Sequence, residues 1–108
     1  MSKAPMKATP ANVSRLLTAA DHQKRTAYPS AIRGMKNYSY GFRCEAADGL
    51  VVVRHMVDGY YDPSPASAKR ARVEYYLPAL KDHFACEVVE QPPGSFYVAV
   101  RPRSEPTP

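Results

Sequence analysis

The stretch FRCEAADGLVVVRHMV, residues 42–57, decides the fold because it carries the strongest turn signal in the chain. Asp48-Gly49 is typical of a two-residue hairpin loop, in which both central residues need a positive φ. A loop at this dipeptide places Arg43 directly opposite Arg54. A pairing shifted by one residue would bury both arginines, so the hydrophobic pattern itself favours this register.

The predicted hairpin, with strands near 39–46 and 51–57, has one apolar and one mixed face. Directly opposed residues point to the same side of a sheet, so both faces can be assigned. The face expected in the core carries Phe42, Cys44, Ala46, Val51, Val53, His55 and Val57. The other face carries Arg43, Glu45, Ala47, Leu50, Val52, Arg54 and Met56. We expect this second face to meet solvent or a partner.

A helix is predicted before the hairpin, from about Pro10 to about His22. Thr9 is a good N-cap and proline is favoured at the first helical position, and apolar residues then recur with helical spacing. The basic segment 23–39 that follows is predicted to be a long connection. A short helical turn around residues 31–35 would shorten it.

A second helix is predicted from about Pro65 to Phe84, with Ser64 as its N-cap. Its apolar stripe contains Ala66, Val73, Leu77, Leu80 and Phe84. Pro78 lies inside this stripe and removes one backbone donor. Because the stripe continues in phase across the proline, we expect a kink in one continuous helix.

Two further strands, 86–90 and 96–101, flank the turn-forming sequence QPPG at 91–94. Pairing Glu90 with Ser95 would place Val89 on the same face as the valines of the last strand. The element order α-β-β-α-β-β predicts an α+β two-layer sandwich, with two helices on one face of a four-stranded antiparallel sheet. We expect one domain at 9–101 between disordered tails at 1–8 and 102–108.

The charge balance is basic, with a formal net charge of +5 and an isoelectric point of about 9.4. Such a balance favours anionic partners, among them nucleic acid, acidic proteins and membrane surfaces. No apolar run approaches the ~20 residues that cross a bilayer. The N-terminal residues MSKAPMKATPANVSR also lack the apolar core of a signal peptide. We therefore expect a cytoplasmic protein that does not bind membranes.

No catalytic or metal-binding signature stands out. The three histidines, His22, His55 and His83, lie in separate predicted elements without metal-ligand spacing, and no glycine-rich phosphate loop occurs. Cys44 and Cys86 are interpreted as small buried hydrophobes, although a single bridge between them stays open. We predict a non-enzymatic protein without a cofactor or metal.

Basic and aromatic side chains form three groups that suit an anionic partner. The first, on the outward strand faces, contains Arg43, Arg54, Tyr97 and Arg101. The second, near the start of the second helix, contains Lys69, Arg70 and Arg72. The third, in the basic segment, contains Lys24, Arg25, Arg33 and Lys36. For any one of these groups alone, a solvated polar face is the favoured interpretation.

Nucleic acid is the leading prediction for the partner. Arginine and lysine neutralise phosphates, and tyrosine stacks on bases. Arg43 opposite Arg54 destabilises the strand pair, because like charges oppose one another. That placement requires Glu45 nearby or an external anion.

A protein-interaction module, or a homodimer contact, is the alternative function. Tyrosine and arginine are enriched at the centres of protein interfaces. Six tyrosines could supply such a surface: Tyr38, Tyr40, Tyr60, Tyr61, Tyr75 and Tyr76. The outward hairpin face, with Leu50, Val52 and Met56 beside Arg54, would serve equally well.

The helix-hairpin-helix-hairpin pattern resembles that of small uncharacterised proteins of actinobacteria and their phages. The resemblance rests on TPANVSRLLTAADH, YGFRCEAADGLVVVRH, and AKRARVEYYLPALKDHFACEVVE leading into FYVAVRPR. It covers most of the chain and implies no activity. For a phage protein, it implies binding to or inhibition of a host factor.

Overall fold

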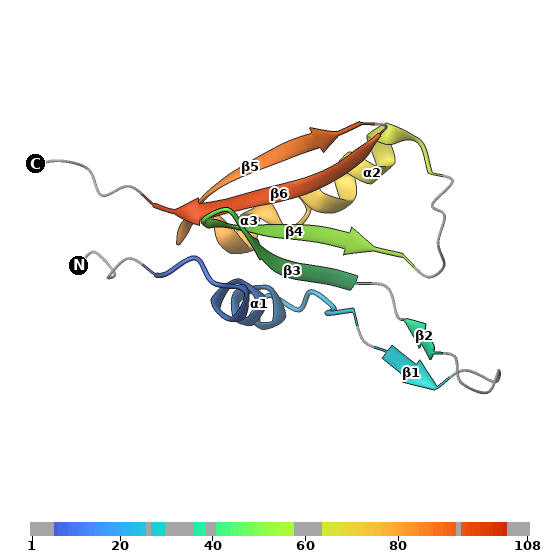
Figure 1. The fold of residues 1–108 in the computed structure, drawn as a ribbon, viewed down its shortest axis with the longest axis horizontal. Helices are drawn as coiled ribbons and strands as arrows, with labels where there is room; N and C mark the ends of the chain where they lie inside the picture. Colours follow the sequence, from blue (N-terminus) through green and yellow to red (C-terminus); the bar gives the residue numbers. More distant parts are fainter. Residues whose placement is uncertain are drawn as a thin grey trace, which may run out of the picture.

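A computed structural model describes residues 6–25, 27–29, 36–38, 41–57, 64–92 and 94–103. Its elements are α1 (Pro10–Ala19), β1 (Ala27–Pro29), β2 (Lys36–Tyr38), β3 (Gly41–Ala47), β4 (Leu50–Met56), α2 (Ala66–Glu74), α3 (Leu77–Leu80), β5 (Phe84–Gln91) and β6 (Ser95–Pro102). They form the predicted α+β sandwich, with a four-stranded antiparallel sheet and the helices as a second layer (Figure 1).

The main sheet has the order β3-β4-β6-β5, so the two hairpins join through their second strands. The first hairpin has the predicted register, with Arg43 opposite Arg54. Asp48 and Gly49 adopt φ values of 48° and 80°, as the two-residue turn requires. This turn chemistry thus sets which side chains of β3 and β4 point into the core.

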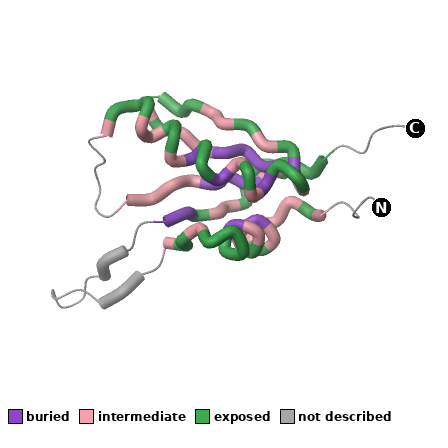
Figure 2. Tube along the Cα trace, turned by 180° about the vertical axis from the view of Figure 1, so that it is seen from behind, coloured by how far each residue is buried: buried purple, intermediate pink, exposed green. Residues whose placement is uncertain are grey.

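The core lies between the sheet and the helices, where the central strands are buried (Figure 2). Val13 and Leu17 of α1 contribute to it beside Val73 of α2 and Leu80 of α3. The strands contribute Phe42, Val51, Val53, Phe84, Val98 and Val100. All three helices therefore cover the same face of the sheet. The other face carries the side chains that point outward from the strands.

The register predicted for the second hairpin is wrong by one residue. Gln91, rather than Glu90, is the partner of Ser95, and Val88 opposes Val98. Gly94 has a φ of 82°, the conformation expected at the last position of a three-residue hairpin loop. One residue fewer in the turn moves every β5 side chain to the opposite face, so Val88 instead of Val89 faces the helices.

The prediction of one kinked helix through Pro78 is also wrong, because α2 and α3 are separate. A proline at 78 cannot donate to the carbonyl of Glu74, and its ring crowds that carbonyl. The chain leaves α2 through Tyr75 and Tyr76, and Tyr76 N–H donates to the carbonyl of Val73 at 3.1 Å. The second helical segment ends before Phe84, which begins β5.

The helix starts follow the predictions only in part. Thr9 caps α1, with its hydroxyl accepting from the N–H of Asn12 at 3.1 Å, but α1 ends at Ala19 rather than near residue 22. Pro65, not Ser64, is the N-cap of α2 and makes no side-chain cap bond. The Ser64 hydroxyl instead accepts a hydrogen bond from Arg72 at 2.8 Å.

The basic segment contains a small antiparallel pair, β1-β2, that the sequence did not predict. Its predicted helical turn at 31–35 lies outside the described residues. Before β1, Lys24 forms a parallel bridge with Phe42 at the β3 edge. Phe42 N–H donates to the carbonyl of Gln23 at 2.9 Å, and Arg25 N–H donates to that of Phe42 at 3.1 Å.

Candidate functional site

The first predicted basic group forms a coherent surface on the outward face of the sheet. We name it the arginine face: Arg43, Arg54, Tyr97 and Arg101. The β3–β4 register places Arg43 beside Arg54. The guanidinium carbon of Arg54 lies 5.1 Å from the centre of the Tyr97 ring, which joins the two hairpins by a cation–π contact.

Glu45 lies between the two opposed arginines. Its Oε1 is 3.9 Å from Nε of Arg43 and 3.8 Å from Nε of Arg54. The Glu45 carboxylate therefore offsets the repulsion between Arg43 and Arg54 that the sequence predicted. All three side chains are partly or largely exposed, and such exposed ion pairs contribute only about 0–1 kcal/mol.

At the centre of the arginine face, two small side chains are covered by the longer side chains around them. Val52 and Ala99 are paired across β4 and β6 and point outward, yet they are only 8% and 2% exposed. Glu45 lies opposite Val52, and Glu87 lies opposite Ala99. The aliphatic stems and carboxylates of the neighbours thus cover the apolar part of this face.

The second predicted group does not join the arginine face. Arg70 donates to Glu74 at 3.1 Å, one turn along α2, and lies 6.0 Å from the centre of the Phe96 ring. Arg72 donates to Ser64 and lines a pocket on the helix side. Lys69 is half-buried on α2. These three cations therefore lie on the helix layer, and the sheet separates them from the arginine face.

The third predicted group is distributed along the edge of the molecule. Lys24 and Arg25 belong to the segment bridged to β3, and Lys36 begins β2. Arg33 lies outside the described residues. The described backbone does not place this group on the arginine face.

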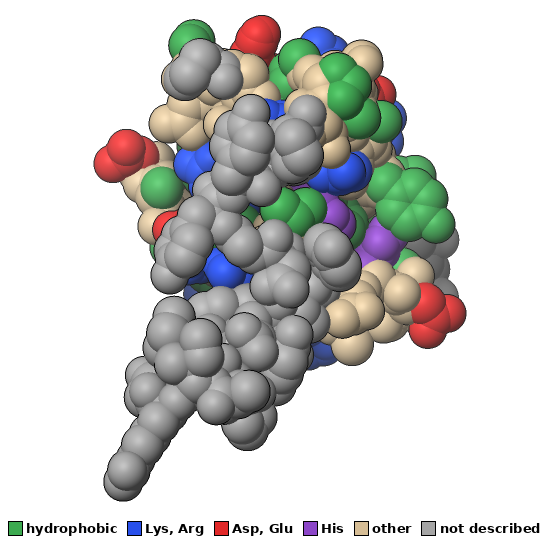
Figure 3. Space-filling model, turned by 90° about the vertical axis from the view of Figure 1, so that its right-hand side faces the viewer, with side chains coloured by type: hydrophobic (Ala, Val, Ile, Leu, Met, Phe, Trp, Pro, Cys, Tyr) green, Lys and Arg blue, Asp and Glu red, His purple; other side chains and the backbone are tan. Residues whose placement is uncertain are grey.

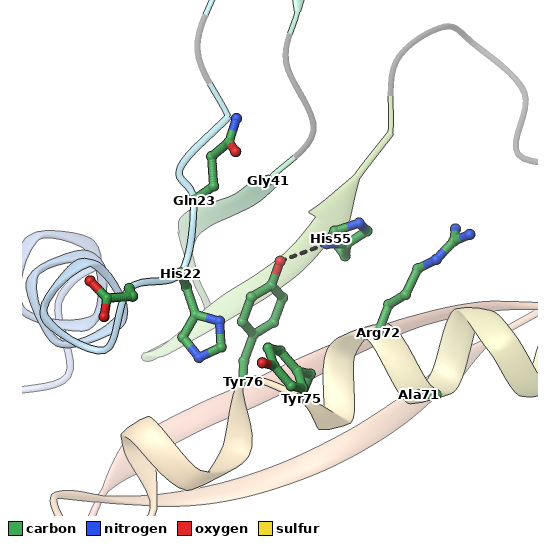
Figure 4. A pocket seen from close by; sticks show the side chains of 9 residues that line it. His22, Gln23, Gly41, His55, Ala71, Arg72, Tyr75 and Tyr76 are labelled. Atoms are coloured by element: carbon green, nitrogen blue, oxygen red, sulfur yellow. Dashed lines mark hydrogen bonds between the residues drawn. The ribbon is translucent and has the colours of Figure 1, made fainter.

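A second candidate site was not predicted from the sequence. We name it the histidine–tyrosine pocket: His22, His55, Arg72, Tyr75 and Tyr76. These side chains line a hollow of about 480 Å³, together with Asp21, Gln23, Gly41 and Ala71. Figure 4 shows that these five side chains come from the linker after α1, from the end of β4, and from the C-terminal end of α2 with the two residues that follow it.

Hydrogen bonding and ring packing fix the back of this pocket. His55 Nδ1 and the Tyr76 hydroxyl share a hydrogen bond of 2.6 Å (Figure 4). The His22 ring packs edge-on against Tyr76 and Tyr75, with centroids 4.9 and 5.1 Å apart. Tyr76 is only 4% exposed, and burial raises the pKa of its hydroxyl to about 12. The buried tyrosine is therefore a neutral anchor at neutral pH.

The rim of the pocket differs from its back. Tyr75 is 72% exposed, and among the described residues it is the large hydrophobic side chain that is exposed to solvent. Seen from the end of the sandwich, histidine side chains lie next to a large hydrophobic side chain, with basic side chains close by (Figure 3). Burial lowers the pKa of His22, partly opposed by the charge of Asp21, so this ring is neutral at neutral pH.

Asp21 has an unusual backbone conformation at the entrance of the pocket. Its N–H donates to Thr18 O, and the N–H of His22 donates to Leu17 O, both at 3.0 Å. This pattern is a Schellman motif, whose left-handed position is usually glycine. Asp21 occupies that position with a φ of 65°. A carboxylate there also opposes the negative end of the helix dipole.

Both thiols pack at the margin of the core rather than at either site. Cys44 and Cys86 are free and partly buried. Burial raises the pKa of both thiols, that of Cys44 to about 11 against the opposing charge of Lys24. Within the described ranges, no cluster of three histidine, cysteine or carboxylate side chains could hold a metal ion.

The sequence contained a partial signal for the pocket. Lys69, Arg72, Tyr76 and His83 fall on one flank of a continuous helix, and two of them, Arg72 and Tyr76, do line the pocket. His22 and His55 could not be added, because their proximity depends on how α1 and the first hairpin pack against α2. The neighbouring tyrosines Tyr75 and Tyr76, just before Pro78, were the local sequence feature that could have indicated this pocket.

None of the helices in the described part of the chain is long and apolar enough to cross a membrane. No family model matches the chain, and no curated protein or solved structure is significantly similar to it.

Proposed function

We propose that the protein is a non-enzymatic nucleic-acid-binding protein and that the arginine face is its binding surface. The observation that carries this proposal is the direct opposition of Arg43 and Arg54, with one carboxylate shared between them. A phosphate can replace Glu45 at small cost, because exposed ion pairs contribute so little. The net charge of +5 adds long-range attraction for a polyanion.

Tyr97 and Arg101 extend the chemistry of this face from the first hairpin to the second. Tyr97 supports the Arg54 guanidinium and offers an aromatic ring for a base, while Arg101 adds an exposed cation at the end of β6. Single-stranded nucleic acid fits best, because an open sheet face can contact phosphates and unstacked bases together.

Binding of a protein partner, such as a host factor or a second copy of the chain, is the second candidate. The exposed ring of Tyr75 favours it, since tyrosine is enriched in interface centres. The burial of Val52 on the outward face counts against docking there, because little apolar surface remains at its centre.

Fluorescence anisotropy with labelled single-stranded DNA and RNA at two salt concentrations tests the nucleic-acid proposal. If three arginines contact three phosphates, raising the salt concentration from about 50 to about 200 mM should weaken binding about 20-fold. Arg43→Glu/Arg54→Glu should abolish binding. Arg15→Glu/Lys81→Glu is the matched control, because it reverses two exposed charges on the helix layer.

Two outcomes would reject the arginine face as the binding site. Absence of binding at low salt would remove the function itself, and a pull-down from lysate would then address the protein partner. Equal loss of binding in both double variants would show that net charge alone attracts the nucleic acid.

A further inference from the structure

Glu45 places a carboxylate at the centre of the arginine face, beside the two arginines proposed to bind phosphate. Its Oε1 lies 3.9 Å from Nε of Arg43 and 3.8 Å from Nε of Arg54. Both distances exceed the ~3.2 Å of a good N–H···O hydrogen bond, so these contacts are ion pairs without hydrogen bonds. The side chain of Glu45 is 44% exposed, and its carboxylate therefore keeps its capacity to accept hydrogen bonds from a ligand.

The side chains around this carboxylate form a continuous series of contacts across three strands. Arg54 contacts both Glu45 and Tyr97, and Arg43 lies beside Glu45 on the neighbouring strand. The strands β3, β4 and β6 that carry these residues are adjacent in the sheet (Figure 1). An aromatic ring, two guanidinium groups and a carboxylate thus lie next to one another, and one bound nucleotide can contact several of them.

A bound phosphate changes the surroundings of Glu45. If the phosphate takes Arg43 and Arg54 as its partners, the Glu45 carboxylate is left beside a second anion. Like charges at this range repel one another. The repulsion is offset only when the ligand itself supplies hydrogen-bond donors to Glu45. Binding is therefore least favourable for a base with few donors and most favourable for a base with two adjacent donors.

Guanine is the base whose donors match a carboxylate. Its N1–H and its exocyclic amino group are neighbours on one edge of the ring, so the two oxygens of one carboxylate can accept from both. Adenine and cytosine have an amino group beside an acceptor nitrogen, and thymine and uracil have one N–H between two carbonyl groups. The guanine O6, next to N1–H, also accepts from arginine, which lies beside the carboxylate here.

We propose that Glu45 makes the arginine face selective for guanine in single-stranded nucleic acid. This inference rests on the proposed function and adds a base preference to it. Phosphate replaces Glu45 as the anion of Arg43 and Arg54, and the N1–H and amino group of a guanine beside that phosphate become the partners of Glu45. The two exchanges together leave no charged group without a partner. Glu45 is thus a specificity-determining residue as well as a counter-ion.

Fluorescence anisotropy at low salt with four short oligonucleotides tests the proposal. Each has about five nucleotides, close to the smallest sites known for sheet-based single-strand binders, and is all thymidine except for its central base. That base is guanine, hypoxanthine, adenine or thymine. Hypoxanthine is guanine without the amino group, so this pair isolates one of the two contacts to Glu45. Guanine should be bound about fivefold more tightly than hypoxanthine, the lower end of the discrimination that a bidentate base contact provides.

Glu45→Gln should change two quantities in opposite ways. Loss of the charge should strengthen binding of the all-thymine oligonucleotide, because the repulsion of phosphate disappears. Replacement of one acceptor oxygen by an amide donor should bring the guanine and hypoxanthine affinities close together. A residue that served only as a counter-ion would change both affinities by the same factor and leave their ratio unchanged.

Glu87→Gln is the matched control. It removes the same charge from an exposed position opposite Ala99 on the same face of the sheet. This variant should leave the ratio of the guanine and hypoxanthine affinities unchanged. Both glutamates lie at the surface, so both variants should fold, which circular dichroism checks.

Three results would overturn the proposal. One is equal affinity for all four oligonucleotides together with loss of binding in Arg43→Glu/Arg54→Glu. The arginine face would then bind phosphates without reading the base, and the proposed function would stand. Another is a guanine preference that Glu45→Gln leaves intact or that Glu87→Gln lowers equally. The third is no binding of any oligonucleotide at low salt, which would remove the proposed function as well.

Discussion

Asp21 shows how one residue can be locally unfavourable for stability in an otherwise regular helix end. It occupies the left-handed position of the α1 Schellman motif, where a side chain costs about 1–2 kcal/mol relative to glycine. Its carboxylate also lies at the negative end of the helix. The residue therefore lowers stability at the C-terminus of α1.

Replacement of Asp21 by glycine should stabilise the protein by about 1 kcal/mol, because the left-handed strain disappears while glycine adds some backbone entropy cost. The measurement is thermal or urea unfolding followed by circular dichroism. Asp48→Gly, at the other left-handed non-glycine position, is the comparison without a pocket. A lower midpoint for Asp21→Gly would show that the carboxylate stabilises the fold.

His22 should make stability depend on pH. Burial holds its pKa below the ordinary 6.5, so the unfolded chain takes up a proton first as the pH falls. The stability that this neutral ring provides is complete above pH 6.5 and is lost as the pH falls through the lower pKa of the folded state. Unfolding free energies between about pH 7.5 and pH 5 measure this loss.

Substitution of His22 by glutamine should flatten that pH dependence, and the slopes rather than the absolute stabilities are compared. His83→Gln removes a histidine outside the pocket and is the control. If the His22→Gln slope equals that of the wild type, burial of this ring does not contribute to acid sensitivity.

Among the elements, β3 can pack against the preceding linker only because its first residue is glycine. Gly41 has a φ of 151°, and a Cβ there would lie 2.3 Å from the carbonyl oxygen of Gln23 and 2.6 Å from the backbone nitrogen of Arg25. Backbone atoms cannot rotate away as a side chain can. The close approach of the linker to β3 therefore requires glycine, and the same approach forms one wall of the histidine–tyrosine pocket.

Gly41→Ala should destabilise the protein by about 3 kcal/mol or more, the sum of backbone strain and a steric clash. Gly94→Ala is the control, since its φ is 82° but nothing lies within 4 Å of an added Cβ. That variant should cost only about 1–2 kcal/mol. Urea denaturation distinguishes the two, and equal losses would mean that the linker moves aside freely.

Local sequence signals predicted those elements whose structure is decided within a few residues. Asp48-Gly49 specified both the turn and the register of the first hairpin, and Thr9 specified the start of α1. The sequence QPPG indicated a turn but not its length, so the β5 register was missed. Pro78 ended the helix although the apolar stripe continued in phase, because the stripe reports burial rather than backbone continuity.

For the whole molecule, the sequence predicted the layers and the arginine face but not the pocket. The face follows from alternation along paired strands, which a register determines. The pocket requires the packing of α1, β4 and α2 against one another, and β1-β2 was missed because strands of three residues show little periodicity. Long-range packing, rather than local preference, supplies these features.

The bridge between Lys24 and Phe42 also bears on self-association. It occupies backbone groups at the β3 edge of the sheet, which would otherwise offer a template for another strand. In the four-stranded sheet, β5 is the other edge strand. Glu87 and Glu90 are exposed along β5, and charged side chains on an edge strand oppose its pairing with another strand. We therefore expect little association of two chains through this edge of the sheet.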